Sequence, residues 1–122
     1  MLYLSTRGSF QKLTSSQAII KGICSDGGLY VPEYFPNISK DIVTLVDFNY
    51  SDLAFYILSK FFDDFTNDEL KYCIDQSYNI KFKNHKVAPI SKIGNLYFLE
   101  LFHGPTLAFK DIALTIMQGQ YP

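Results

Sequence analysis

The chain has 122 residues, of which 48% are hydrophobic and 19% are charged, and its formal net charge is -1. This composition is typical of a folded globular domain and excludes an intrinsically disordered chain. The near-neutral charge argues against a dedicated nucleic-acid-binding protein, which normally carries a basic excess. No apolar run approaches the roughly 20 residues that a membrane span requires, so no membrane association is expected.

Two cysteines, Cys24 and Cys73, are too few for a disulfide framework or a zinc cluster. We interpret them as reduced thiols. The stretch MLYLSTRGSF at the start of the chain lacks the pattern of a secretory signal peptide. A cytoplasmic location is therefore the expectation.

The first third of the chain predicts a small unit of short elements. Residues 2–5 favour a strand, and Ser15 or Ser16 can cap a helix that runs through QAIIKGIC. The sequence SDGG at 25–28 is expected to stop this helix, because paired glycines allow the left-handed backbone of a turn. The following LYVP at 29–32 reads as an extended segment that ends at proline.

Residues 51–79 predict a helical hairpin. Ser51 is a good cap for DLAFYILSKFF, in which apolar residues recur at helical spacing. Thr66 opens the second helix, and Glu69 three positions later indicates a capping box. The expected buried stripe of the second helix consists of Leu70, Cys73, Ile74 and Ser77.

The basic stretch KFKNHK at 81–86 is read as a solvated linker, with binding of phosphate or nucleic acid as the alternative. After it, VAPISKI and LYFLELF are separated by Gly94 and Asn95. Two apolar runs around such a dipeptide predict a β-hairpin within residues 87–102.

Residues 100–117 read ELFHGPTLAFKDIALTIM and contain one lysine in an otherwise apolar stretch. Gly104 and Pro105 are expected to end the strand, and Thr106 to cap a helix that begins at Leu107. The helix has three sides. One stripe contains Leu107, Lys110, Leu114 and Met117, an adjacent apolar stripe contains Phe109, Ile112, Ala113 and Ile116, and the more polar side contains Ala108, Asp111, Thr115 and Gln118.

Lys110 is thus predicted to lie along an apolar face near a helix start. Burial and the positive end of the helix dipole would both lower the pKa of its amine. A deprotonated lysine amine is a nucleophile that can form an imine with a carbonyl. The alternative is a lysine whose methylene stem follows the apolar surface while its amine reaches water, and the periodicity leaves both readings open.

The segment FHGPTLAFKD closely resembles the cofactor-lysine segment of threonine synthases, which are pyridoxal-phosphate enzymes of fold type II. The resemblance extends over most of the chain. Further matching segments are LYLSTRG near the start, SSQAIIKGICSDGGLYVPE, and DLAFYILSKFF.

The resemblance implies that Lys110 holds pyridoxal 5'-phosphate as a Schiff base and also acts in catalysis. The implied reaction converts O-phospho-L-homoserine and water to L-threonine and phosphate. The implied architecture is α/β, with a mostly helical N-terminal domain at 1–86 and the start of the catalytic domain at 87–122. That second part would contain the hairpin and the cofactor-lysine helix.

Other residues of the matching segments are open to two readings. Asp26, Gly27 and Gly28 either shape a turn or line the active site. His103 either approaches the cofactor or has a structural role, and Phe109 packs either beside the cofactor or in the core.

The chain is much shorter than the catalytic chains of this family, and it contains no match to their phosphate-binding loop. The expectation is therefore an N-terminal fragment that is inactive alone. Its apolar residues Phe109, Ile112 and Ile116 would then be exposed and would favour dimerisation, domain swapping or disorder of the last helix. The alternative function is a non-catalytic threonine-synthase-like protein that binds a phosphorylated small molecule.

Overall fold

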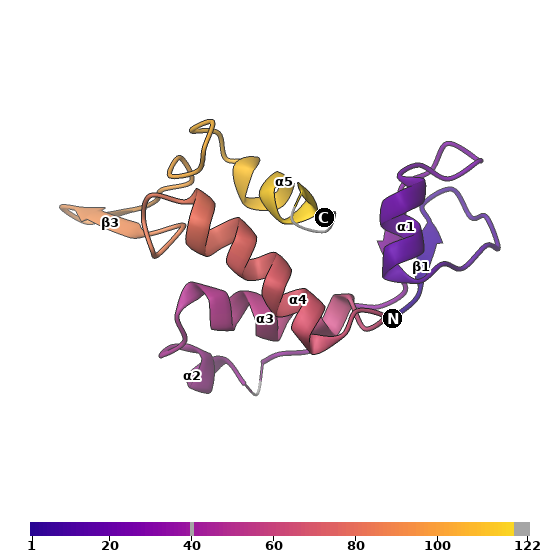
Figure 1. Ribbon diagram of the computed structural model, residues 1–122, viewed down its shortest axis with the longest axis horizontal. Coiled ribbons are helices and arrows are strands. Elements are labelled where there is room, and N and C mark those ends of the chain that lie inside the picture. The colour runs from indigo at the N-terminus through magenta and orange to yellow at the C-terminus, as the bar shows by residue number, and fades with distance from the viewer. Residues whose placement is uncertain (40, 119–122) are drawn as a thin grey trace.

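A helical hairpin forms the centre of the protein (Figure 1). It consists of α3 (Tyr50–Phe61), α4 (Asn67–Ile74) and a π-helical turn, η1 (Asp75–Asn79), which continues α4. The computed structural model describes residues 1–39 and 41–118. The hairpin predicted for residues 51–79 is confirmed, and the π-helical turn at its end was not predicted.

Side-chain caps begin both helices of the hairpin. The Thr66 side chain accepts a hydrogen bond from the Glu69 N–H, and Glu69 accepts one from the Thr66 N–H at 2.8 Å, so the predicted capping box is confirmed. The cap of α3 is Asn49, which accepts a bond from the Asp52 N–H at 2.9 Å. The prediction of Ser51 as this cap is wrong by two residues, because Asn49 offers an equally good acceptor earlier in the chain.

The main hydrophobic core lies between η1, α4 and the last helix, α5 (Asp111–Gln118), with α3 packed against it. Burying each large aliphatic side chain of such a core contributes about 1.5–3 kcal/mol relative to leaving it exposed. The predicted stripe of α4 and η1 is confirmed, since all four of its residues are buried. The core cluster consists of Leu70, Cys73, Ile74, Tyr78, Phe82, Val87 and Ile116.

A smaller N-terminal unit contains the antiparallel strands β1 (Tyr3–Ser5) and β2 (Tyr30–Pro32) and the helix α1 (Ser15–Lys21). Both strands lie within the segments predicted as extended. Helix α1 is capped by Thr14, whose side chain accepts from the Gln17 N–H, so the prediction of Ser15 or Ser16 as the cap is wrong by one or two residues.

Asp26 shapes the turn before β2. Its carboxylate accepts hydrogen bonds from the Ser5 hydroxyl and the Gly28 N–H, both at 2.8 Å, and from the Ser9 N–H at 3.2 Å. The Gly28 bond and then the Ser5 bond are the main causes that lower the pKa of Asp26. These contacts support the turn-shaping reading of Asp26, and they tie β1 to the same turn.

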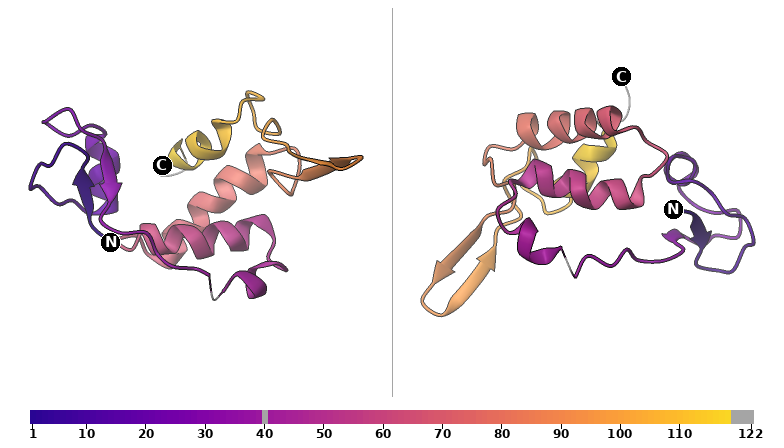
Figure 2. Two further views of the ribbon diagram at one scale, coloured as in Figure 1. Left: turned by 180° about the vertical axis from the view of Figure 1, so that it is seen from behind. Right: turned by 90° about the horizontal axis from the view of Figure 1, so that it is seen from below.

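Two short elements complete the fold. Helix α2 (Ile42–Leu45) precedes α3, and the strands β3 (Ile90–Ile93) and β4 (Leu96–Leu99) form the predicted antiparallel hairpin. Gly94 at its tip has φ +59°, a conformation that glycine adopts without steric cost. The hairpin and the N-terminal unit lie at opposite ends of the molecule (Figure 1, Figure 2). Helices with two small antiparallel sheets agree with the expected α/β class.

Within the described ranges, no helix is both long enough and apolar enough to cross a membrane.

Asp64, in the loop between α3 and α4, attaches the N-terminal unit to the helical hairpin. Its carboxylate accepts bonds from the Ser15 hydroxyl, from the Ser16 N–H at 3.0 Å and from the Ser16 hydroxyl at 2.5 Å. Asp64 is an exposed residue, but the partial loss of water around its carboxylate is the largest single influence and acts to raise its pKa. The hydrogen bonds from Ser15 and Ser16 together outweigh it and hold that pKa well below its usual range.

We predict that this attachment is sensitive to acid. A carboxylate whose folded-state pKa is depressed contributes stability above its unfolded pKa of about 3.9 and loses it as the pH falls further. The substitution Asp64→Asn should lower the free energy of unfolding at pH 7 by about 1 kcal/mol, a small effect because water screens this exposed carboxylate. In the Asp64→Asn variant, the free energy of unfolding should also fall less than in the original protein as the pH drops below about 4.

Urea unfolding between pH 2 and pH 7 measures both effects. Asp47→Asn is the matched control, because Asp47 is an exposed carboxylate in the loop between α2 and α3. Equal losses of stability in the two variants would show that Asp64 does not hold the N-terminal unit.

Candidate functional site

Lys110 is the residue immediately before α5. Its carbonyl accepts hydrogen bonds from the N–H groups of Ala113 at 3.0 Å and Leu114 at 2.9 Å, so its backbone is part of the helix start. The prediction that the helix begins at Leu107 is wrong. Leu107 has φ +60°, in the left-handed region, which is incompatible with a right-handed helix.

A clamp between Thr106 and Asp111 explains the late start of α5. The Asp111 carboxylate accepts bonds from the Thr106 N–H at 2.8 Å and from the Thr106 hydroxyl at 2.6 Å. The hydroxyl bond is the main cause that lowers the pKa of Asp111. Thr106 therefore binds the first residue of α5 from outside the helix and does not cap a helix that follows it directly.

Gly104 packs closely against Asp111, one of the two residues of this clamp. A Cβ atom at Gly104 would lie 2.4 Å from the Asp111 Cβ and 2.5 Å from its Oδ2. Both distances are too short for any side chain, so the glycine of the HGPT turn is required by the close approach of Asp111.

The side chain of Lys110 is exposed, which agrees with the second of the two readings that the periodicity left open, a lysine whose amine reaches water. The apolar residues that were expected to surround it are also exposed, namely Leu107, Phe109, Leu114 and Met117. Among the described residues, no carboxylate forms an ion pair with Lys110. The chain thus fixes the backbone of Lys110 and leaves its amine accessible.

The opposite side of α5 faces the core, which corrects two predictions. Asp111 and Thr115, assigned to the polar outer side, are each only 5% exposed. Ile112 and Ile116, expected to be exposed, pack against the core cluster. The Thr115 hydroxyl donates to the Asp111 carbonyl at 2.6 Å, and a polar group with a partner can be buried at little cost.

His103 has a structural partner. Its Nε2 lies 2.7 Å from Oε2 of Glu100, and both side chains are partly buried. The bond from His103 is the main cause that lowers the pKa of Glu100. This pairing favours the structural reading of His103. Phe109 is exposed, so a core role for it within the described chain is excluded.

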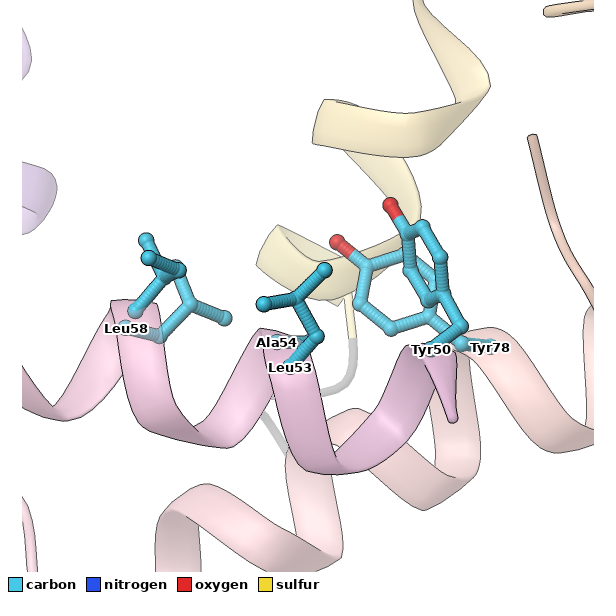
Figure 3. Close-up of a pocket in the computed structure, with 6 residues that line it drawn as sticks. Tyr50, Leu53, Ala54, Leu58 and Tyr78 are labelled. Atoms are coloured by element: carbon cyan, nitrogen blue, oxygen red, sulfur yellow. The ribbon is translucent and has the colours of Figure 1, made fainter. Parts of the chain in front are cut away.

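An apolar hollow of about 240 Å³ lies along α3. Its lining residues carry no charge, and Lys110 is not among them. Figure 3 shows this hollow with the rings of Tyr50 and Tyr78 at one end. The hollow lining consists of Tyr50, Leu53, Ala54, Ile57, Leu58 and Tyr78.

Chemically, the described residues offer a nucleophile. A primary amine on a fixed backbone can bind the carbon of an aldehyde covalently when it is deprotonated. No group of three or more histidine, cysteine or acidic side chains suited to a metal ion occurs in the described part of the chain. The Thr106–Asp111 clamp and the Gly104 contact are the parts of this segment that sequence reasoning missed.

Comparisons with known proteins agree with the resemblance seen in the sequence. Residues 2–78 match the family model described as threonine synthase N terminus. The chain is 39% identical over 127 residues to a threonine synthase of Methylobacillus glycogenes, which covers 96% of this chain and 27% of that protein. It is 41% identical over 120 residues to the threonine synthase of Pseudomonas aeruginosa, with 96% and 25% covered.

A solved structure supports the same family. The PLP-bound threonine synthase from Brucella melitensis superposes with a TM-score of 0.91 and 34% sequence identity, covering 98% of this chain and 26% of that one. The chain spans about a quarter of the length of the relatives that it matches.

We predict that the hydroxyl of Thr106 stabilises the start of α5. Thr106→Val removes the bond to Asp111 while keeping the side-chain shape, whereas Thr106→Ser keeps the hydroxyl. The valine variant should exchange the amide hydrogens of Ala113 and Leu114 on the order of tenfold faster at pH 7, the factor expected for the loss of one net hydrogen bond. Hydrogen exchange followed by NMR measures this.

The serine variant should exchange at nearly the original rate. Because the folded-state pKa of Asp111 is lowered, the difference between the valine and serine variants should shrink as the pH falls below about 4. A valine variant with unchanged exchange at pH 7 would contradict the clamp.

Proposed function

Because the chain belongs to the threonine synthase N-terminus family, we propose that it forms part of a pyridoxal-phosphate-dependent threonine synthase in which Lys110 binds the cofactor. The proposed reaction converts O-phospho-L-homoserine and water to L-threonine and phosphate. One observation carries the assignment of the residue. Lys110, in the segment HGPTLAFKD, has a backbone held by α5 and an amine open to a ligand.

The described residues offer one group that fits pyridoxal phosphate, namely a primary amine. This cofactor carries an aldehyde, and the accessible amine of Lys110 is the group that would hold it covalently. When bound, the cofactor supplies the electron sink for the reaction. The absence of a described ion pair to Lys110 supports this role, because the amine need not leave a carboxylate partner first.

Lys110 has a second role in this proposal. When the substrate is present, the amine of Lys110 accepts and returns protons at the carbon atoms of the substrate. Proton transfer by a positioned side chain contributes roughly 10²- to 10⁴-fold to the rate. The clamp of Thr106 on Asp111 keeps the Lys110 backbone in place while the side chain moves.

We also propose the division of roles that the sequence suggests. Residues 1–86 form the N-terminal domain, and residues 87–122 begin the catalytic domain. This division concerns function and not packing, because α5 packs on the core formed by residues of the first part. The 122-residue chain alone is expected to be inactive. A cytoplasmic location and association through the exposed apolar residues around Lys110 complete the proposal.

The test is chemical trapping in the complete protein that carries this sequence. After incubation with pyridoxal phosphate and reduction with borohydride, mass spectrometry should find the phosphopyridoxyl group on Lys110. Lys110→Ala should abolish both the trapped group and the visible absorbance, and should lower threonine formation by at least roughly 10³-fold.

Lys92→Ala is the matched control, because Lys92 is an exposed lysine in β3 with its amine 5.1 Å from the Tyr97 ring. It should retain cofactor binding and activity. Trapping at another lysine would contradict the assignment. Binding of phosphorylated small molecules without any trapped group would favour the non-catalytic alternative.

A further inference from the structure

Two adjacent residues of η1 bind α5 through its backbone. The Tyr78 hydroxyl donates to the Ile112 carbonyl at 2.9 Å. The Ser77 hydroxyl lies 3.0 Å from the Thr115 carbonyl and 2.6 Å from the Cys73 carbonyl, so its single proton is shared between the two helices. Ser77 is completely buried, and Tyr78 is 5% exposed. Hydrogen bonds in such a dry environment are sensitive to small displacements.

The bonded carbonyls are close to Lys110 along the chain. Ile112 is two residues after Lys110, and α5 begins between them. The Lys110 carbonyl is itself bonded to the N–H groups of Ala113 and Leu114. A shift of α5 against η1 would therefore carry the Lys110 backbone with it.

Neighbouring aromatic rings hold the Tyr78 side chain in place. Its ring contacts the Tyr50 ring edge to face, with centroids 5.0 Å apart, and contacts the Phe82 ring at 5.8 Å. The Tyr50 and Tyr78 rings stand side by side, with the ribbon of α5 behind them (Figure 3). Burial raises the pKa of Tyr78, so its hydroxyl remains protonated and remains a donor across the working pH range.

The π-helical form of η1 provides a second observation. Single π-helical turns within α-helices are rare and occur frequently at functional sites, because the wider turn redirects the side chains that follow. Here the π-helical turn spans Asp75–Asn79 and contains both residues that bind α5. The non-standard turn thus coincides with the contact to the lysine helix.

We propose that Ser77 and Tyr78 are positioning residues for the reaction at Lys110: they set the location of its amine through α5 without touching it. This inference rests on the proposed function. It means that the N-terminal helical domain contributes to the catalytic site, and that η1 is the element through which it does so.

The test compares Tyr78→Phe with Tyr50→Phe in the complete protein. Each substitution removes one hydroxyl from the same aromatic pair, but of these two hydroxyls it is that of Tyr78 that donates to a carbonyl of α5. Tyr78→Phe should lower kcat on the order of tenfold with KM changed less than about threefold. Misplacement of a reacting group by about 1 Å can cost up to 10²-fold. Tyr50→Phe should stay within about twofold of the original protein.

Spectroscopy provides a readout that a loss of stability alone would not change. At a temperature where every variant is folded, as checked by circular dichroism, the pH midpoint of the cofactor absorbance should shift in Tyr78→Phe and in Ser77→Ala, but not in Tyr50→Phe. If Ser77→Ala does not fold, the result for Tyr78→Phe alone tests the positioning role, because this substitution keeps the aromatic ring and its packing.

The outcomes separate the two proposals. If the original protein shows no trapping at Lys110, the proposed function fails and the positioning role fails with it. If trapping occurs but Tyr78→Phe and Tyr50→Phe have equal kcat and equal pH midpoints, only the positioning role is overturned.

Discussion

The contact between η1 and α5 is the interaction on which the rest of the site depends. Its apolar part, in which Ile116 packs into the core cluster, provides the burial that holds the two elements together. Burial is not directional, and it would tolerate a helix that slides or rotates by a fraction of a turn. The bonds from Ser77 and Tyr78 to the carbonyls of α5 remove that freedom, because a displaced helix would leave buried polar groups without partners.

Lys110 lies between two constraints of different origin. On its C-terminal side, α5 is fixed by η1, and on its N-terminal side Thr106 is bound to the Asp111 carboxylate. Neither constraint involves the lysine side chain. The Lys110 side chain can consequently change its conformation while its Cα position is kept. Gly104 makes the second constraint possible, since any side chain there would push Asp111 away from Thr106.

The elements that sequence reasoning located correctly are those governed by local signals, such as the Thr66–Glu69 capping box, the stripe of α4 and the turn at Gly94. The predicted start of α5 was wrong because Thr106 is a residue type that often caps a helix. Its actual bond to Asp111 depends on the fold of the turn between them. Asp111 and Thr115 were assigned to the exterior by residue type. Their burial is possible because their polar groups have hydrogen-bond partners, and the spacing of apolar residues in the sequence does not reveal those partners. Lys110 was singled out by its place in an apolar stretch and was given a cofactor role by family resemblance. Its exposure matches one of the two readings that the periodicity left open.

The exposure of Lys110 and of the β3–β4 hairpin lead to the same conclusion: both surfaces need to be covered by other groups. A two-stranded hairpin is marginally stable alone in water, yet this one exposes apolar side chains such as Ile90, Leu96 and Phe98. Such a surface is costly unless other groups cover it. The cofactor role proposed for Lys110 likewise requires a water-excluded site, which the described residues do not provide around the amine. The chain therefore supplies the position of the amine, and the enclosure that the proposed chemistry requires must come from groups outside the described residues.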